Sequence, residues 1–361
     1  MRLALAERFR GLFWTQLLGA FNDNFFKQAL IILIVFQGFG NLDMKDDKLS
    51  ELALAVFTVP FFLLSATAGQ IADKFDKALV IQRLKIVELV IAGLAGIGFF
   101  TESVPVLFLA LALLGIQSAF FGPLKYGIIP QLLSEEDLTE GNAAVETGTK
   151  LAILLGTLAG GVLATSENAK LYCTATVLVI AVLGYLMAKA VPPVGRSDPN
   201  LKVDVNPLKP TFQVIGLARR VRAVFLSILG VSWFWALGGG LLALLPVYGK
   251  TILQVDATVV NFFQAVFSIG VAIGAVVCGK LSHQRVELGL VPFGSIGITV
   301  FLADIALLGS PFEVPPGQLM TLNALLHDPQ GWRVLVDFAG IAASSGLYIV
   351  PLYTVIQQRT E

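Results

Sequence analysis

The chain has 361 residues, of which 56% are hydrophobic and 14% are charged, and its mean hydropathy is +0.79. Soluble chains average about 25% charged residues, so the composition excludes an ordinary soluble domain and predicts an all-α, polytopic membrane protein. The formal net charge is zero and no basic stripe interleaved with aromatic residues occurs, so no nucleic-acid partner is expected. With two histidines, and with Cys173 and Cys278 inside apolar segments, the sequence predicts no metal site, no disulfide and no cofactor.

Ten apolar segments are long enough to cross a bilayer as helices, which takes about 20 residues each. In chain order they are roughly 12–39, 51–71, 79–100, 104–124, 143–164, 171–191, 224–248, 259–279, 288–308 and 332–356. The longest polar segment, 192–222, is rich in proline and carries charges of both signs. We predict that it is a cytoplasmic linker between an N-terminal six-helix bundle, 1–191, and a C-terminal bundle, 223–361.

The distribution of lysine and arginine predicts the orientation, because cytoplasmic loops carry an excess of both. With the N-terminus in the cytoplasm, eighteen basic residues lie on that side of the membrane and five on the other. Lys27 and Lys150 lie within apolar segments and are not counted. The sequence therefore predicts a multi-pass protein whose N-terminus is cytoplasmic.

The first apolar segment is interrupted by a polar stretch, which reads LLGAFNDNFFKQAL over residues 17–30. A charge near the middle of such a helix costs at least about 2.5–3.5 kcal/mol, and it normally faces a bundle interior or a watery pathway. Asp23 and Lys27 are four residues apart, so they share one helix face. Two alternatives stay open: a purely structural ion pair, which would not explain Asn22 and Asn24, and a Lys27 that extends toward a membrane face.

A second acid–base pair, Glu146 and Lys150, lies at the start of the fifth segment, and Lys125 follows the fourth. All three residues are in the first half of the chain, as is the stretch around Asp23. The alternative for Glu146 and Lys150 is a solvated pair at the cytoplasmic end of the helix. The alternative for Lys125 is an anchor at the cytoplasmic face.

An internal repeat is visible in the connections between segments. GQIADKFDK at 69–77 corresponds to GKLSHQR at 279–285, and PLKYGIIPQ at 123–131 corresponds to PLYTVIQQ at 351–358. Two six-span halves in parallel orientation would give this pattern. By that logic the second half is truncated after the tenth span, and we expect the chain to be a fragment of a longer protein.

The run G-x-hydrophobic-A-D-K, from Gly69 to Lys74, resembles the loop signature of the major facilitator superfamily. The resemblance implies the fold of that superfamily and a structural role at the cytoplasmic gate. There Gly69 would allow close helix approach, Asp73 would cap a helix or form an ion pair, and Lys74 would complete the signature.

Three further stretches together resemble the lysophospholipid transporter family: GAFNDN at 19–24, PLKYGI at 123–128 and LLGTLAGGVLA at 154–164. This resemblance is strong over the first five segments and holds only in outline beyond them. It implies a secondary transporter that moves lysophosphatidylethanolamine and related lysolipids from the outer to the inner leaflet of the bacterial inner membrane for reacylation. The family associates the position matching Asp23 with the substrate headgroup.

The headgroup of lysophosphatidylethanolamine is a zwitterion, which a cavity with both acidic and basic side chains matches without net charge. We expect the carboxylates to take the ammonium group, the lysines to take the phosphate, and the asparagines to hydrogen-bond glycerol or phosphate oxygens. The predicted substrate-binding residues are Asn22, Asp23, Asn24, Lys27, Lys125, Glu146 and Lys150.

The family includes stand-alone flippases and the transporter halves of fusions with an acyltransferase and an acyl–acyl carrier protein synthetase. The expected partners are therefore the lysophospholipid, membrane lipids and such an enzyme, fused or separate. No catalytic residue is predicted, because neither His283 nor His327 begins the acyltransferase motif H-x-x-x-x-D. Two alternatives stay open: a generic drug or metabolite efflux carrier of the same superfamily, and the transport module of a bifunctional acyltransferase.

Overall fold

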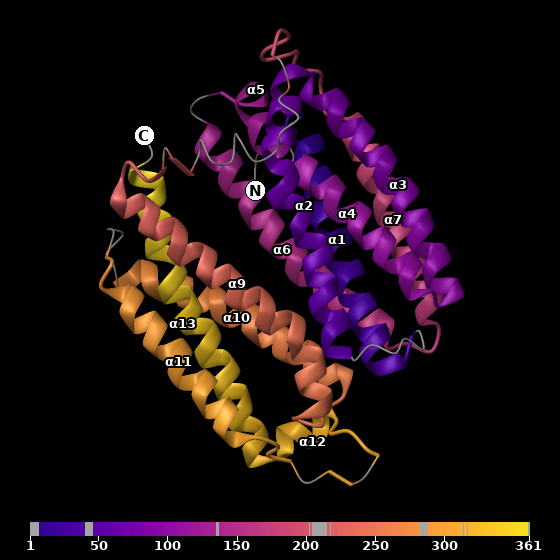
Figure 1. The fold of residues 1–361 in the computed structure, drawn as a ribbon, viewed down its shortest axis with the longest axis vertical. Helices are drawn as coiled ribbons and strands as arrows, with labels where there is room; N and C mark the ends of the chain where they lie inside the picture. The colour runs from indigo at the N-terminus through magenta and orange to yellow at the C-terminus, as the bar shows by residue number, and fades with distance from the viewer. Residues whose placement is uncertain are drawn as a thin grey trace. The chain divides into compact units, whose positions relative to one another are not determined.

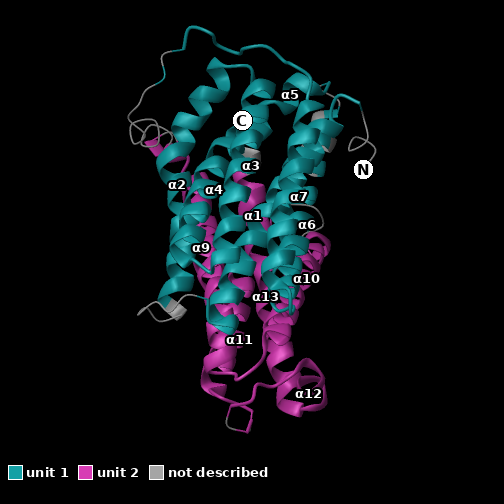
Figure 2. Cartoon of the chain, turned by 90° about the vertical axis from the view of Figure 1, so that its right-hand side faces the viewer, with its two compact units in different colours: residues 1–212 teal, residues 213–361 magenta. Residues whose placement is uncertain are grey.

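The computed structural model describes residues 7–39, 46–134, 137–201, 203, 215–216, 218–281, 287–312, 314–315 and 317–359. The chain divides into two compact units, residues 1–212 and residues 213–361 (Figure 2). We describe each unit by itself.

Among the described residues, ten helices are long and apolar enough to span a membrane, which confirms the ten predicted segments (Figure 1). Those of the first unit are α1 (Arg10–Gln37), α2 (Asp46–Lys74), α3 (Lys77–Thr101), α4 (Val104–Gly127), α6 (Leu138–Ala164) and α7 (Ala169–Lys189). Those of the second unit are α9 (Arg222–Thr251), α10 (Ala257–Leu281), α11 (Leu290–Leu308) and α13 (Pro329–Arg359). Two short helices, α5 (Ile129–Leu132) and α12 (Leu322–His327), lie in the connections.

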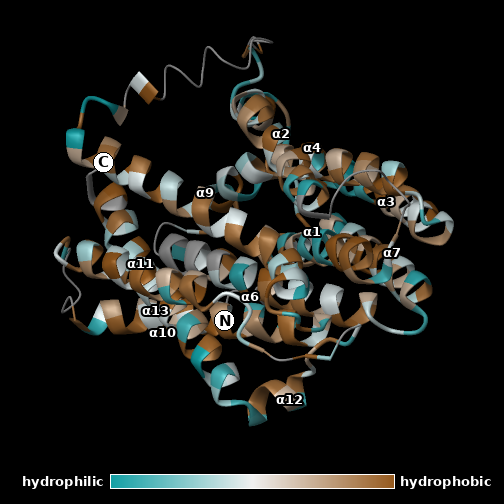
Figure 3. Cartoon of the chain, turned by 60° about the horizontal axis from the view of Figure 1, so that its bottom comes forward, coloured by the Kyte–Doolittle hydropathy of each residue, from teal (hydrophilic) through white to brown (hydrophobic). Residues whose placement is uncertain are grey.

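Several helices extend beyond the predicted apolar segments, because the backbone continues its helix into polar residues at the segment ends. The clearest case is α2, which begins at Asp46 and ends at Lys74, whereas the apolar pattern predicts 51–71. Apolar residues predominate along the long helices (Figure 3). Many are exposed, such as Phe62 at 75% and Leu307 at 87%, as expected for helices in contact with lipid.

In the first unit, α1 packs against α6 and α7, α3 packs against α4 and α7, and α2 packs against α4. The contact between α1 and α6 is close because two glycines of α6 lie against the α1 backbone. A Cβ atom at Gly160 would lie 2.5 Å from the carbonyl oxygen of Phe25, and one at Gly156 would clash with the carbonyl oxygen of Phe21. Small residues allow this approach between membrane helices, so the glycines of the LLGTLAGGVLA stretch have a packing role.

The connection between α2 and α3 is organised by Asp76, which is the N-cap of α3. One oxygen of its carboxylate accepts hydrogen bonds from the backbone N–H groups of Ala78 and Leu79, at 2.9 and 3.3 Å. The other oxygen accepts from the N–H groups of Val194 and Gly195, at 3.2 and 2.7 Å. One side chain thus caps a helix and ties down the segment that follows α7.

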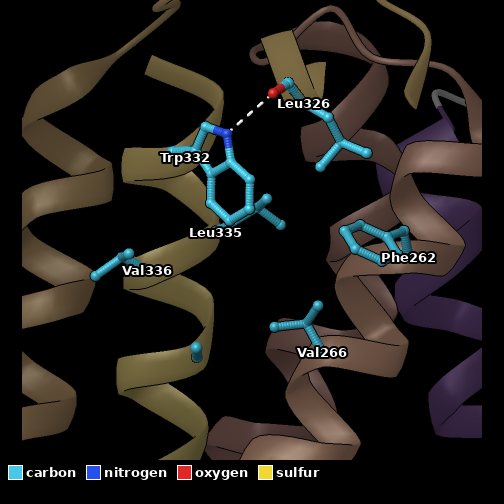
Figure 4. Close-up of a pocket in the computed structure, with 7 residues that line it drawn as sticks. Phe262, Val266, Leu326, Trp332, Leu335 and Val336 are labelled. Carbon is cyan, nitrogen blue, oxygen red and sulfur yellow. Dashed lines mark hydrogen bonds between the residues drawn. The ribbon is translucent and has the colours of Figure 1, made fainter. Parts of the chain in front are cut away.

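In the second unit, α13 packs against α10, α11 and α9. The face of α13 toward α10 and α12 borders an apolar pocket, in which the indole N–H of Trp332 donates to the carbonyl of Leu326 at 2.9 Å (Figure 4). The pocket is lined by Phe262, Val266, Leu326, Trp332, Leu335, Val336 and Ala339.

Candidate functional site

A buried polar cluster lies inside the first unit, between α1, α3 and α4. At its centre is the carboxylate of Glu88, which accepts hydrogen bonds from Lys85 Nζ at 2.6 Å, Gln117 Nε2 at 3.2 Å and Asn22 Nδ2 at 3.3 Å. The Lys85 and Glu88 side chains are 0% and 1% exposed. A fully buried ion pair needs additional hydrogen bonds to offset the loss of hydration, and the two amides supply them. We call Asn22, Lys85, Glu88 and Gln117 the Glu88 cluster.

Lys85 lies deeper in its membrane-spanning helix than the count of cytoplasmic lysine and arginine residues assumes. It is eight residues beyond the start of α3, or about 12 Å at 1.5 Å per residue, and its ammonium group faces the cluster. Removing it from the cytoplasmic count leaves seventeen basic residues against five, so the predicted orientation is unchanged. Gly19 of α1 makes room for the ammonium group, since a Cβ atom there would lie 2.6 Å from Lys85 Nζ.

Asp23 of α1 is connected to this cluster through α4. The hydroxyl of Ser118 lies 2.7 Å from Asp23 Oδ2 and 3.2 Å from Gln117 Oε1, so it can donate to either acceptor. Because Gln117 also donates to Glu88, a continuous polar path joins the two carboxylates. Asp23 as a whole residue is partly buried.

Lys27 shares a helix face with Asp23, but no ion pair within 4.0 Å joins the two side chains among the described residues. The ammonium group of Lys27 instead lies 4.2 Å from the ring centre of Phe57 on α2, in a cation–π contact. The amide of Asn24 donates to the carbonyl of Ala20 at 2.7 Å, within α1. Of the predicted residues of the first helix, the structure thus connects Asn22 and Asp23 most directly to the rest of the unit.

The other three predicted binding residues lie elsewhere in the first unit. Lys125 is at the end of α4, about 10 Å along the helix from Ser118, with its ammonium group 4.7 Å from the ring centre of Tyr126. Lys150 is on α6 and its side chain is exposed. The side chain of Glu146 is outside the described residues, so its predicted pairing with Lys150 stays a prediction.

Within the first unit, the signature loop makes an ion pair expected of Asp73 but not a close helix contact at Gly69. Within the first unit, a Cβ atom at Gly69 would meet no atom within 4 Å, so Gly69 makes no close helix contact there. The capping residue is Asp76, not Asp73. The Asp73 carboxylate lies 3.8 Å from Lys77 Nζ and its backbone carbonyl accepts from the N–H of Asp198 at 2.8 Å. Lys74 places its ammonium group 5.9 Å from the ring centre of Phe75.

Sequence reasoning missed Lys85, Glu88, Gln117 and Ser118. The signal that singled out Asp23, a polar residue inside an apolar segment, is also present at these four positions. No group of three or more histidine, cysteine, aspartate or glutamate side chains in the described part of the chain could hold a metal ion. The arrangement places the carboxylate of Asp23 near a neutral, hydrogen-bonded ion pair, and a carboxylate suits the binding of a cation.

In the described part of the chain, ten helices are long and apolar enough to span a membrane and charged side chains are held between helices, which is the architecture of a polytopic membrane transporter. The sequence profile described as Major Facilitator Superfamily matches residues 12–360. The chain belongs to this superfamily and is a secondary transporter with its all-helical fold.

Curated relatives include the "Lysophospholipid transporter LplT" of Enterobacter sp. (strain 638), which is 28% identical over 350 residues, covering 95% of this chain and 78% of the relative. The protein of the same name from Citrobacter koseri is 28% identical over 351 residues, with the same two coverages. The one from Salmonella heidelberg is 29% identical over 335 residues, covering 87% of this chain and 78% of the relative.

Solved structures support the fold. A bacterial homologue of the human lysosomal transporter Spinster, inward-facing and unoccupied, matches with a TM-score of 0.67 at 16% identity, covering 97% of this chain and 75% of that one. A D-xylose–proton symporter matches with a TM-score of 0.64 at 13% identity, covering 96% and 81%. At these sequence identities, the substrates of the two solved transporters cannot be inferred for this chain.

Proposed function

We propose that this transporter moves a lysophospholipid with a zwitterionic headgroup, of the lysophosphatidylethanolamine type, from the outer to the inner leaflet of a bacterial inner membrane by alternating access. The observation that carries the proposal is the carboxylate of Asp23 inside a membrane-spanning helix, which accepts a hydrogen bond from Ser118 next to the Glu88 cluster. The relatives named as lysophospholipid transporters support the substrate class.

The charges of the site suit a zwitterion. Asp23 and Lys27 contribute one negative and one positive charge, and Lys85 and Glu88 neutralise each other. Asp23 would bind the ammonium group and Lys27 the phosphate, since a lysine over an aromatic ring still has N–H groups to donate. Each contact would be stronger between packed helices than in water.

Asn22 has a more specific role than the sequence suggested. Its amide nitrogen donates to Glu88, while its carbonyl oxygen is buried and has no hydrogen-bond partner among the described residues. The group without a partner is therefore an acceptor, which would suit the glycerol hydroxyl or an ammonium N–H of the substrate, not a phosphate oxygen. Asn24, whose amide donates to its own helix, would act through its remaining polar atoms.

The remaining predicted residues would serve later steps. Lys125, Glu146 and Lys150 would guide the headgroup toward the cytoplasmic face, and Gly69, Asp73 and Lys74 would belong to the gate there. Reacylation by an acyltransferase and acyl–acyl carrier protein synthetase, fused or separate, would remove the product and favour inward movement. The surrounding membrane lipids would contact the exposed apolar faces of the helices.

The test uses cells that lack their own lysolipid transporter and express the full chain. Labelled lysophosphatidylethanolamine is supplied from the periplasmic side, and its conversion to diacyl lipid is followed. We expect uptake by the wild type and loss of uptake in Asp23→Asn. The matched control is Glu167→Gln, which removes one negative charge from an exposed position between α6 and α7 and should transport normally.

The possible outcomes test the lysolipid substrate and the headgroup-binding role of Asp23 separately. Absence of uptake by a well-expressed wild type would contradict the lysolipid assignment and favour a carrier of drugs or metabolites. Normal uptake by Asp23→Asn would contradict the assignment of the headgroup to Asp23 while leaving the substrate in place.

A further inference from the structure

The connection between α11 and α13 is folded into a cap on the second unit. The side chain of Thr321 caps its short helix, α12, at the N-terminus. Just before it, the N–H of Met320 donates to the carbonyl of Gln254 at 2.7 Å, and the carbonyl of Met320 accepts from the N–H of Asp256 at 3.0 Å. These two bonds join the cap to the connection between α9 and α10. Leu325 of α12 is fully buried, so the cap is anchored by contacts of its own.

This cap closes one end of the apolar pocket between α10 and α13. Leu326 of α12 lies at that end, and its carbonyl accepts the indole N–H of Trp332, so the cap holds the aromatic wall of the pocket in place. Phe262 and Val266 of α10 lie on one side of the pocket and Trp332 of α13 lies on the other (Figure 4). The pocket has a volume of about 250 Å³. Typical small-molecule pockets have roughly 300–1,000 Å³, so this one has room for part of a single acyl chain and not for two.

The pocket extends along the part of α13 that crosses one leaflet. It runs from Trp332 to Ala339, about 10 Å along the helix, while half of a hydrocarbon core is about 15 Å thick. Trp332 is three residues beyond the start of α13, and tryptophan is enriched at this level of a membrane. Nine of the described long helices precede α13. If each crosses once, the pocket is in the leaflet opposite the N-terminus, which is the outer leaflet in the predicted orientation.

The chemistry of the pocket favours a hydrocarbon chain as its occupant. Water is excluded because an apolar lining gives it too few hydrogen bonds. Trp332 and Val336 line the pocket and are 56% and 59% exposed, so the pocket is open at the surface of the unit. Lipid tails are as apolar as this lining, so a chain gains little from leaving the bilayer for the pocket. Selection must therefore come from the shape of the pocket and from polar groups beside it.

Charged side chains of both signs lie at the same end of α13. Arg333 follows Trp332 and donates from Nε and Nη2 to the two oxygens of Asp304 on α11, at 3.0 and 2.6 Å. Both side chains stay accessible, at 47% and 36% exposed, and a guanidinium group has further N–H donors for a phosphate. Asp328 accepts the N–H of Gln330 through Oδ1 at 2.7 Å, and its other oxygen can accept from an ammonium group. This end of α13 therefore matches a zwitterionic headgroup.

We propose that the capped pocket between α10, α12 and α13 is a docking site for a lysophospholipid in the leaflet opposite the N-terminus. The single acyl chain lies along Phe262, Val266 and Trp332. The phosphate binds at Arg333 and the ammonium group at Asp328. A diacyl lipid binds less well, because the pocket has no room for a second chain. The identity of the lipid rests on the proposed function, which assigns a site to the headgroup but none to the acyl chain.

Photo-crosslinking tests this site without measuring transport. The full chain is placed in vesicles of diacyl phosphatidylethanolamine and phosphatidylglycerol, with a trace of lysophosphatidylethanolamine that carries a diazirine on its acyl chain, and the labelled peptides are identified by mass spectrometry. We expect labelling within 262–266 and 332–339 that unlabelled lysophosphatidylethanolamine reduces several-fold. Added diacyl phosphatidylethanolamine, or a monoacylglycerol with the same chain, should reduce it much less. Labelling at Phe62, which is 75% exposed, reports contact with bulk lipid and should not respond.

Variants that fill the pocket supply the second arm. Val266→Phe adds a ring inside the pocket and should lower the labelling of 332–339 several-fold. The matched control Val276→Phe adds the same ring to α10 at a position that is 59% exposed, and its labelling should stay at the wild-type level. Ala339→Leu narrows the pocket from α13 and takes the place of Val266→Phe if that variant does not fold, as judged by thermal unfolding.

Labelling that diacyl lipid displaces as well as lysolipid does, or that persists unchanged in a folded pocket variant, shows only bulk lipid against an exposed tryptophan and overturns the docking site. Absence of labelling in both ranges also overturns it, because another part of a protein then covers the pocket. Equal competition by the monoacylglycerol overturns the headgroup contacts at Arg333 and Asp328.

The uptake assay described above separates this inference from the proposed function. A wild type that takes up lysophosphatidylethanolamine without labelling in the pocket overturns the docking site alone. A wild type that is labelled in the pocket but takes up no lysolipid contradicts the proposed transport and supports the docking site.

Discussion

Glu88 shows how one buried residue can depend entirely on its partners. Its carboxylate is inside the membrane-spanning part of α3, where it is compatible with folding because Lys85 and two amides satisfy it. Removing one member of a buried ion pair leaves an uncompensated charge and typically costs about 3–5 kcal/mol, whereas replacing both is often nearly neutral. The pair should therefore behave as one unit.

We predict that Lys85→Met and Glu88→Gln each lower the melting temperature of the purified protein strongly, and that the double variant recovers most of the loss. Thermal unfolding in detergent, followed by tryptophan fluorescence, measures the three changes in a double-mutant cycle. Losses that simply add in the double variant would show that the two side chains do not stabilise each other.

Ser118 donates a hydrogen bond to the carboxylate of Asp23. Replacing it with alanine removes the hydroxyl that lies 2.7 Å from Asp23, and a hydrogen bond to a charged group contributes about 1.5–3 kcal/mol. We expect Ser118→Ala to lower the melting temperature, because this bond is lost from the folded protein, and to raise the half-saturating lysolipid concentration, because Asp23 is no longer held in position. Ser118→Thr, which keeps a hydroxyl, is the control. Equal transport by the alanine and threonine variants would contradict a role for this bond.

At the scale of helices, the contact between α1 and α6 depends on glycine. A Cβ atom at Gly160 would lie 2.5 Å from the backbone carbonyl of Phe25, which cannot move without shifting α1. Gly93 of α3 is also within a long helix, but a Cβ atom there would meet nothing within 4 Å. We predict that Gly160→Ala destabilises the protein and that Gly93→Ala leaves it unchanged or stabilises it by up to about 1 kcal/mol through helix propensity. Thermal unfolding of both variants tests this, and equal stability would contradict close packing.

The two functions of the Asp76 side chain can be separated. Asparagine caps helices about as well as aspartate, but its amide nitrogen cannot accept the N–H of Gly195. We expect Asp76→Asn to keep the stability of α3 while increasing tryptic cleavage at Arg196, and Asp76→Ala to lose both, with about 1–2 kcal/mol of stability. Limited proteolysis and thermal unfolding provide the two readouts. Unchanged cleavage in Asp76→Asn would mean that the bond to Gly195 does not restrain the segment.

The membrane-spanning helices can be predicted from the sequence because a long apolar run is a local signal. The residues of the candidate site can be predicted only in part. Long apolar runs identify each span, and Asp23 stands out inside one of them. The count of basic residues includes Lys85 among those on the cytoplasmic side, because the sequence does not fix where α3 begins. The helix starts at Lys77, two residues before the predicted segment. That Ser118 meets Asp23, 95 residues away, follows from the packing of α1 against α4. A single sequence carries no direct signal of such a contact.

At the scale of the whole chain, the repeat seen in the loops recurs in the packing. In the first unit α2 and α3 both pack on α4, and in the second unit α10 and α11 both pack on α13. Burial differs, however: 67% of the most apolar stretch of α1 is buried, against 11% for α9, its counterpart in the repeat. Among the described helices, α9 has no partners equivalent to α6 and α7, which explains why it exposes Trp233 and Trp235.

The orientation in the membrane yields the last prediction. If each long helix crosses once, Glu102 lies after three crossings and Arg196 after six, so the two positions are on opposite sides. The natural cysteines are 0% and 1% exposed and should give little background with a membrane-impermeant thiol reagent. With the N-terminus in the cytoplasm, as the basic residues predict, intact cells should be labelled at Glu102→Cys, and Arg196→Cys should react only after permeabilisation. The reverse pattern would invert the orientation, and it would move the predicted gate to the periplasmic face.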